Sequence, residues 1–273
     1  MAGSFKVKYT IDAESKQGGI HLQLYMTAAP DQYRPLAGLG FRLCHLAYQI
    51  GPDNHLHRSI VSRQTQNGLM AISDTAPPPI QDSAQLCREI LRECTNRGFD
   101  GVHADFGTVT TPDRIAFLEQ LSPLLHRNSK KLFVSSAYGR HVPSAYVLIN
   151  TALSGGTLRA MLSDAAYTFG RQRIAMDIER LRMDFLLPSP SGEGTALSQG
   201  TFEALYQECA PSVFFSHELC AKYFTYQKEG RTHFVLFDDA DTIRFKLKLG
   251  TALELRYAFL LYSEVSDLAA SLR

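Results

Sequence analysis

The stretch Gly98-Phe99-Asp100-Gly101-Val102-His103-Ala104-Asp105-Phe106-Gly107 decides the fold of this chain. An amphipathic segment, residues 84–97, precedes it, and its apolar periodicity predicts a helix that ends at Gly98. The stretch itself is apolar, short and acidic at its end. This pattern predicts a buried strand whose carboxyl end presents Asp105 to a site.

Strand and helix patterns alternate on both sides of this stretch. Apolar runs predict eight core strands at residues 20–27, 41–50, 68–73, 99–106, 131–137, 145–152, 173–179 and 257–262. Helical patterns occupy residues 84–97, 111–127, 154–169, 201–209 and 241–254. Such alternation predicts a parallel sheet, and 273 residues is the usual size of one closed barrel. We therefore expect one (β/α)₈ TIM-barrel domain spanning residues 1–273.

Two additions to this barrel are expected. Residues 5–12 alternate apolar and charged side chains, which predicts an extra, half-exposed N-terminal strand. Between strands seven and eight, residues 182–200 are rich in Pro, Ser and Gly and predict an exposed loop. The runs 222–226 and 233–237 then predict a hairpin, so we expect a small insertion at this point.

Composition excludes several classes of partner and cofactor. A net charge of +1 gives no electrostatic reason to expect nucleic acid or an anionic membrane, and no apolar run reaches the roughly 18 residues of a membrane span. No Gly-rich phosphate motif or metal-ligand spacing occurs, so we expect neither a cofactor nor a metal. The five scattered cysteines are expected to be reduced. The first residues lack a signal-peptide core, which predicts either a cytoplasmic protein or a chain whose leader was removed.

The opening stretch resembles the fourth-strand signature D-G-x-D-x-D-x-E of family 18 glycoside hydrolases, the chitinase family. Asp100 and Gly101 match its opening pair, and Asp105 matches the second of the later carboxylates. His103 stands in place of the first of these, and Gly107 stands in place of the catalytic glutamate.

Other segments carry the same resemblance, which extends from about residue 20 to residue 264. The run 233–239 is similar to the family's His-x-Val-Trp-Phe-Asp-Asp segment, and residues 43–48 are similar to its second strand. Two family tryptophans are replaced by Leu236 and Tyr262, since the chain contains no Trp. The strand-six Met-x-Tyr-Asp motif is replaced by residues 150–153.

The resemblance implies substrate-assisted chemistry, in which a glutamate protonates the glycosidic oxygen and the sugar's own acetamide attacks. Glycine at position 107 cannot donate a proton, whereas Asp105 could still orient an acetamide. The resemblance therefore implies a non-hydrolytic or weakly active binder of an N-acetylglucosamine-type glycan. The side chains expected to line its site are Tyr25, Tyr48, His103, Asp105, Asn150, Asp177, Glu179 and Tyr262.

Strand seven supports an alternative. Alternation along residues 173–180 places Asp177 and Glu179 on one face and apolar residues on the other, so both carboxylates should point into the barrel. Asp105 and Glu179 could then be the catalytic pair of an active glycosidase. Alternatively, Glu179 could form a salt bridge with a nearby arginine and have a purely structural role. A third possibility is a scaffold or interaction protein that binds no glycan.

Overall fold

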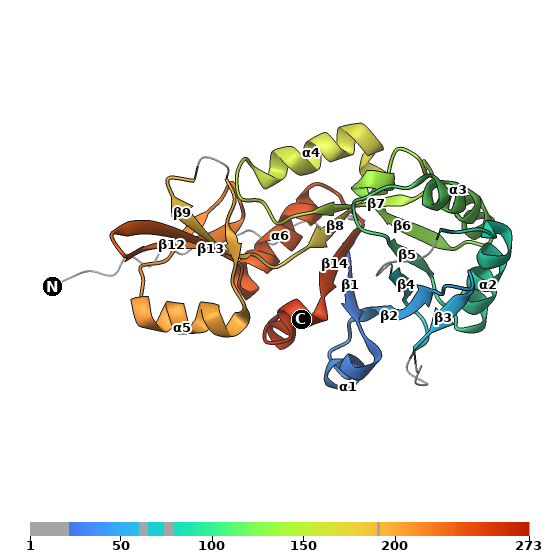
Figure 1. The fold of residues 1–273 in the computed structure, drawn as a ribbon, viewed down its shortest axis with the longest axis horizontal. Helices are drawn as coiled ribbons and strands as arrows, with labels where there is room; N and C mark the ends of the chain where they lie inside the picture. Colours follow the sequence, from blue (N-terminus) through green and yellow to red (C-terminus); the bar gives the residue numbers. More distant parts are fainter. Residues whose placement is uncertain (1–21, 60–64, 74–78, 190–191, 273) are drawn as a thin grey trace, which may run out of the picture.

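The computed structural model describes residues 22–59, 65–73, 79–189 and 192–272. Eight parallel strands close into a ring (Figure 1). In ring order they are β1 (Gln23–Ala28), β2 (Arg42–Ile50), β4 (Leu69–Ser73), β5 (Gly101–Asp105), β6 (Lys131–Ser135), β7 (Tyr146–Asn150), β8 (Ile174–Ile178) and β14 (Tyr257–Leu261). The predicted TIM barrel is confirmed. A short strand, β3 (Leu56–Arg58), pairs antiparallel with β2 outside the ring.

Helices cover the outside of the barrel. They are α1 (Tyr33–Leu36), α2 (Ser83–Asn96), α3 (Pro112–Arg127), α4 (Leu158–Phe169) and α6 (Ala240–Ala252). The four-residue helix α7 (Tyr262–Val265) instead follows directly on the carboxyl end of β14. Between β6 and β7 the 3₁₀ turn Ser136–Tyr138 replaces a full helix. The helix predicted at 84–97 is confirmed as α2, which Asp82 caps by accepting a hydrogen bond from the Gln85 backbone.

The insertion is larger than the sequence predicts. After β8 the chain forms a five-stranded antiparallel sheet, which stands beside the barrel together with α5 (Gln199–Cys209). Its strands are β9 (Arg182–Leu187), β10 (Thr195–Ala196), β11 (Phe214–Ser216), β12 (Ala221–Lys228) and β13 (Arg231–Phe237). The predicted hairpin is confirmed as β12 and β13.

The prediction of an exposed loop at residues 182–200 is wrong for its first part, residues 182–187. Residues 182–187 form β9, which pairs along its whole length with β13. Phe185 is buried opposite Phe234 in this pairing. The pairing joins segments about fifty residues apart, so no local pattern could indicate it. The extra strand predicted at residues 5–12 lies outside the described residues.

The opening stretch forms β5 with its turn, as predicted. Gly98 adopts a left-handed backbone conformation, with φ of +68°, after α2. A side chain at Gly101 would place its Cβ 2.2 Å from the carbonyl oxygen of Lys131, so glycine is required where β5 meets β6. Asp100 binds Arg42 at 2.6 Å and ties this turn to the start of β2.

Asp238 closes the neck of the insertion. The chain leaves the barrel at Leu181 and returns at Asp238, and the backbone N–H of Asp238 donates to the carbonyl of Leu181. The Asp238 carboxylate accepts the Leu181 N–H at 3.0 Å, the Thr242 hydroxyl at 2.7 Å and the Lys246 ammonium at 2.6 Å. Asp238 and Lys246 are both fully buried, so each supplies the counter-charge of the other.

Replacing Lys246 with Met is expected to lower the free energy of unfolding by about 3 kcal/mol or more, because Asp238 would remain buried without its counter-charge. Urea denaturation measures this loss. Lys248→Met is the matched control, since Lys248 lies on the same helix but is exposed, and it should change stability by less than about 0.5 kcal/mol. Equal effects of the two substitutions would contradict this role of the ion pair.

Candidate functional site

A cavity of about 280 Å³ opens at the carboxyl ends of the barrel strands. Four carboxylates line it: Asp105 at the end of β5, Asp177 on β8, Glu179 just after β8 and Glu264 on α7. Catalytic and binding sites of TIM barrels lie at this face. The alternation on strand seven is confirmed, because Asp177 and Glu179 face the cavity while Met176 and Ile178 pack against the outer helices.

Burial and neighbouring charges let Asp177 keep its proton to a higher pH than an ordinary aspartate does. Burial raises the pKa of Asp177 from 3.8 to about 6, and the charges of Glu179, Asp105 and Glu264 add to the rise. Burial also raises the pKa of Glu264, although the backbone N–H of Arg180 donates to its carboxylate at 3.1 Å and opposes this rise. The mouth therefore holds carboxyl groups that can be proton donors as well as acceptors.

Glu179 is held by an amide and not by an arginine. Asn150, at the end of β7, donates its side-chain N–H to Glu179 at 2.5 Å and accepts the Ala152 backbone N–H at 2.7 Å. Arg180 turns away and pairs with Asp267 at 2.6 Å. Within the described part of the chain no ion pair joins Glu179 to an arginine, so the salt bridge considered above does not form there.

His103 lies inside the barrel beneath the carboxylates. Its Nδ1 is 3.9 Å from the Cys44 sulfur, and its ring packs against Phe259 with centroids 5.5 Å apart. Burial lowers the pKa of His103, although the nearby Asp105 charge works against this. A neutral imidazole therefore forms part of the cavity floor.

Position 107 borders open space. Gly107 lines the cavity, and no atom lies within 4 Å of the place where its Cβ would be. Its φ of +65° is a backbone conformation that residues with side chains seldom adopt. The Ser135 hydroxyl donates to the Gly107 carbonyl at 2.6 Å and fixes this loop to the end of β6. The space is thus available, but the loop is shaped for glycine.

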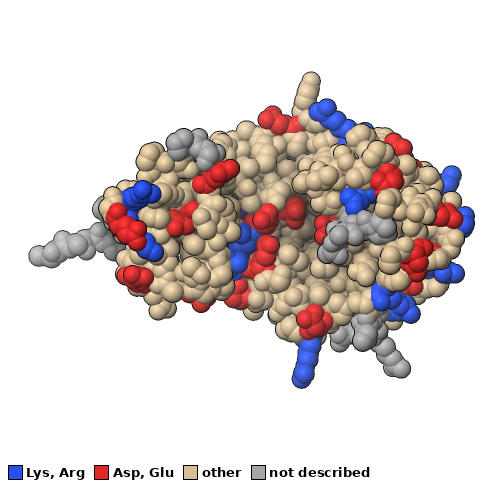
Figure 2. Space-filling view, viewed as in Figure 1, with Lys and Arg blue, Asp and Glu red and all other residues tan. Residues whose placement is uncertain are grey.

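The mouth continues into a second cavity beside the insertion. This cavity has a volume of about 590 Å³ and shares Asn150, Glu179 and Glu264 with the first. Arg182 and Phe185 on β9 form part of its far wall. Figure 2 shows acidic and basic atoms around the hollow between the insertion and the barrel. Together the two cavities form a groove that is longer than the barrel mouth alone.

The three tyrosines predicted for the site lie elsewhere. Tyr25 is fully buried in the barrel core, where its ring stacks on Phe259 with centroids 5.3 Å apart. Strand β1 continues to Ala28, so the inward-facing residue that reaches the cavity is Thr27 and not Tyr25. The prediction placed Tyr25 on the correct face of the strand, but Tyr25 lies deeper in the barrel than the cavity does.

Tyr48 and Tyr262 point to the outside of the barrel. The pairing of β2 with β4 shifts register between Leu46 and Tyr48, which directs Tyr48 toward α2, where its hydroxyl donates to Glu93 at 3.0 Å. Tyr262 begins α7 and packs against the apolar layer between barrel and helices. Neither residue lines either cavity at the mouth, so the prediction that they line the site is wrong.

Glu264 was not predicted. It lies three residues after β14, on the short helix α7 that returns over the mouth. Its position just beyond the last barrel strand is a signal that sequence reasoning could have used, because residues after strand ends form the mouth of this fold.

No group of three or more His, Cys, Asp or Glu side chains in the described ranges is arranged to hold a metal ion. In the same ranges no helix is long and apolar enough to cross a membrane.

Comparison with solved structures finds barrels of the same kind. The chitinase from Chromobacterium violaceum has a TM-score of 0.67 at 17% identity, covering 92% of this chain and 98% of that one. The spore cortex-lytic enzyme SleL of Bacillus megaterium has a TM-score of 0.64 at 18% identity, covering 88% of this chain and 70% of that one. A class V chitinase mutant from Nicotiana tobaccum, solved in complex with NAG4, has a TM-score of 0.66 at 10% identity, covering 92% of this chain and 99% of that one.

No family model and no curated protein matches the sequence. At these low identities the structural likeness establishes the fold and not the activity. The resemblance seen in the opening stretch is confirmed at that level: the chain has the fold of a chitinase-like (β/α)₈ barrel.

Proposed function

We propose that this protein binds an N-acetylglucosamine-type glycan in the groove at the barrel mouth and hydrolyses it weakly or not at all. The observation that carries this proposal is a carboxylate-lined mouth with glycine at position 107. The cavity presents Asp105, Asp177, Glu179 and Glu264, which can accept hydrogen bonds from sugar hydroxyl and acetamide groups. The position where the resemblance places the general acid has no side chain to donate a proton.

The shape of the groove supports an oligosaccharide more than a single sugar. The mouth and the neighbouring cavity share three residues and run from the barrel to the insertion sheet. Ligands bind in such clefts through a few placed polar groups and apolar walls. Phe185 and Phe259 supply apolar surface in the two cavities, in place of the tryptophan that the chain lacks.

A second candidate is an active glycosidase that uses other carboxylates. Two observations favour it: Asp105 and Glu179 line the same cavity, and the pKa of Asp177 is raised to about 6. A carboxyl group whose pKa is raised toward neutrality is better suited to protonate a leaving group than an ordinary aspartate is. A scaffold protein that binds no glycan is the remaining alternative.

Calorimetry with chitooligosaccharides and peptidoglycan fragments tests the proposed binding. We expect saturable binding by the wild type, weakened about 10- to 100-fold in Asp105→Ala through loss of a charged acceptor. Asp164→Ala, at an exposed position on α4, is the matched control and should bind as the wild type does. Absence of binding to both glycans would favour the scaffold alternative.

Mass spectrometry of the titrated sugar distinguishes the binder from the hydrolase. We expect the oligosaccharide to remain intact after prolonged incubation. Steady turnover of the sugar or of a chromogenic glycoside would overturn the non-hydrolytic assignment. Glu179→Gln and Asp177→Asn would then identify the acid, since loss of a general acid lowers the rate by about 10² to 10⁴.

Asp177→Asn is expected to stabilise the fold at neutral pH. Because the folded state raises the pKa of Asp177 to about 6, ionisation of this group between about pH 4 and pH 6 progressively destabilises the protein. Relative to the wild type, the free energy of unfolding of the variant should therefore be higher by on the order of 1 to 3 kcal/mol above pH 6 and little changed below pH 4. Urea denaturation across this range, with Asp164→Asn as control, measures the gain. A variant that is less stable than the wild type at pH 7.5 would refute this account.

A further inference from the structure

A second pocket, of about 560 Å³, opens at the opposite end of the barrel. It lies at the amino ends of four strands, β6, β7, β8 and β14, and is bordered by the last turn of α3. The mouth lies at the carboxyl ends of the same strands. The two sites are therefore separated by the full height of the barrel.

The pocket is rich in cations and free of acids. Among its thirteen lining residues none is Asp or Glu, while Lys130, Lys131, Arg173 and Arg256 contribute cationic side chains to its wall. The whole chain has a net charge of only +1, so this is a local excess of positive charge. A concave wall of one charge sign concentrates ions of the opposite sign.

Two of these cations have a structural role. Arg173 donates hydrogen bonds to the carbonyls of Ala145, Phe169, Gly139 and Val142 at 2.9 to 3.2 Å. Lys130 donates to the Phe99 carbonyl at 2.5 Å. Both side chains cap loop carbonyls at the foot of the barrel, and their charges remain in the wall of the pocket.

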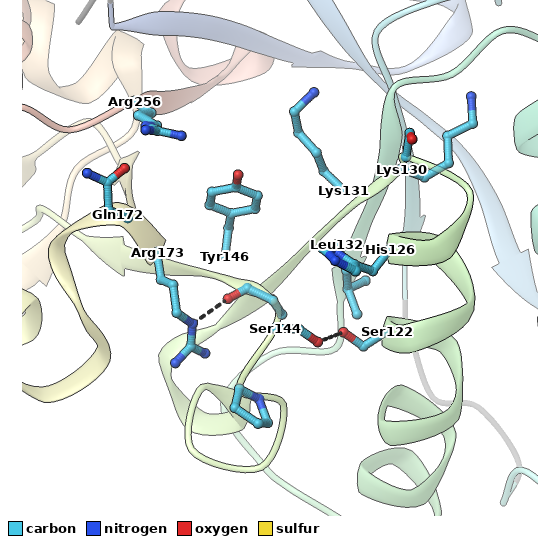
Figure 3. A pocket seen from close by; sticks show the side chains of 13 residues that line it. Ser122, His126, Lys130, Lys131, Leu132, Ser144, Tyr146, Gln172, Arg173 and Arg256 are labelled. Carbon is cyan, nitrogen blue, oxygen red and sulfur yellow. Dashed lines mark hydrogen bonds between the residues drawn. The ribbon is translucent and has the colours of Figure 1, made fainter.

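Lys131 and Arg256 have no such role. Neither side chain makes an ion pair or a hydrogen bond within the described part of the chain, although the Lys131 Nζ lies 6.0 Å from the centroid of the Tyr257 ring. Figure 3 shows the polar ends of Lys131, Tyr146, Gln172 and Arg256 around the same open space, while the Arg173 guanidinium turns away from it. Two unpaired cations and two neutral polar groups thus face one cavity.

We propose that this pocket binds a phosphate-bearing small molecule, with the phosphate between Lys131 and Arg256. A phosphate carries up to two negative charges and several acceptor oxygens, which suits an ammonium, a guanidinium fork and neutral donors together. The Tyr146 hydroxyl and the Gln172 amide are the neutral donors. The volume falls in the range of small-molecule sites and leaves room for the remainder of the ligand.

Calorimetric titration of the whole chain with inorganic pyrophosphate, at fixed ionic strength, tests the proposal. We expect saturable binding near one equivalent, weakened at least about tenfold in the double variant Lys131→Gln/Arg256→Gln. The control Arg34→Gln/Lys248→Gln removes the same charge at exposed positions that do not line the pocket, and should keep the affinity within about twofold.

Arg256→Gln alone keeps the test valid if the double variant does not fold, because Arg256 is exposed, and it should weaken binding several-fold. Absence of saturable binding, or equal weakening in both double variants, would overturn the proposal. Tighter binding of a polyglutamate peptide than of pyrophosphate would also overturn it in favour of an acidic protein partner. Glycan binding at the mouth is measured separately, so failure here leaves that proposal untouched.

Discussion

The buried pair of Asp238 and Lys246 is the interaction on which the arrangement of the site depends. Through its backbone and its carboxylate, Asp238 binds Leu181, the residue at which the chain leaves the barrel. A fully buried charge pair is maintained only when its remaining acceptors and donors are satisfied, and Thr242 and the Leu181 backbone meet this need. The neck of the insertion is therefore closed, and β9 forms the second wall of the groove beside the mouth.

The mouth remains acidic because the arginines near it are used elsewhere. Arg180 pairs with Asp267 and donates to the carbonyl of Glu264, so its charge is drawn away from Glu179. Four carboxylates consequently share one cavity, and burial together with the neighbouring charges raises the pKa of Asp177 to about 6. Such a site favours ligands that donate hydrogen bonds, such as hydroxyl and amide groups, and disfavours anions. A cluster of like charges with a raised pKa, which lowers stability, is typical of functional sites.

Sequence reasoning succeeded where a local pattern fixes the structure, and failed where a distant contact does. Apolar runs located all eight barrel strands, and alternation placed Asp177 and Glu179 on the inner face. The position of Tyr48 depends on a register shift between β2 and β4, which leaves no trace in the residues around it. Strand β9 exists because β13 pairs with it, although Pro, Ser and Gly follow it at once. Tyr25 shows a third limit, because alternation gives the face of a strand but not the layer within the barrel.

An aromatic layer separates the two ends of the barrel, which differ in charge. Strands β6, β7 and β8 each contain five residues, which places their ends roughly 13 Å apart. Between those ends Tyr25, Phe133 and Phe259 pack with ring centroids 5.0 to 6.2 Å apart and fill the interior. Charges on opposite sides of such a core are held apart by the strands and cannot pair. A chain with a net charge of +1 can therefore keep an acidic cavity at one end and a basic pocket at the other, each with its own ligand preference.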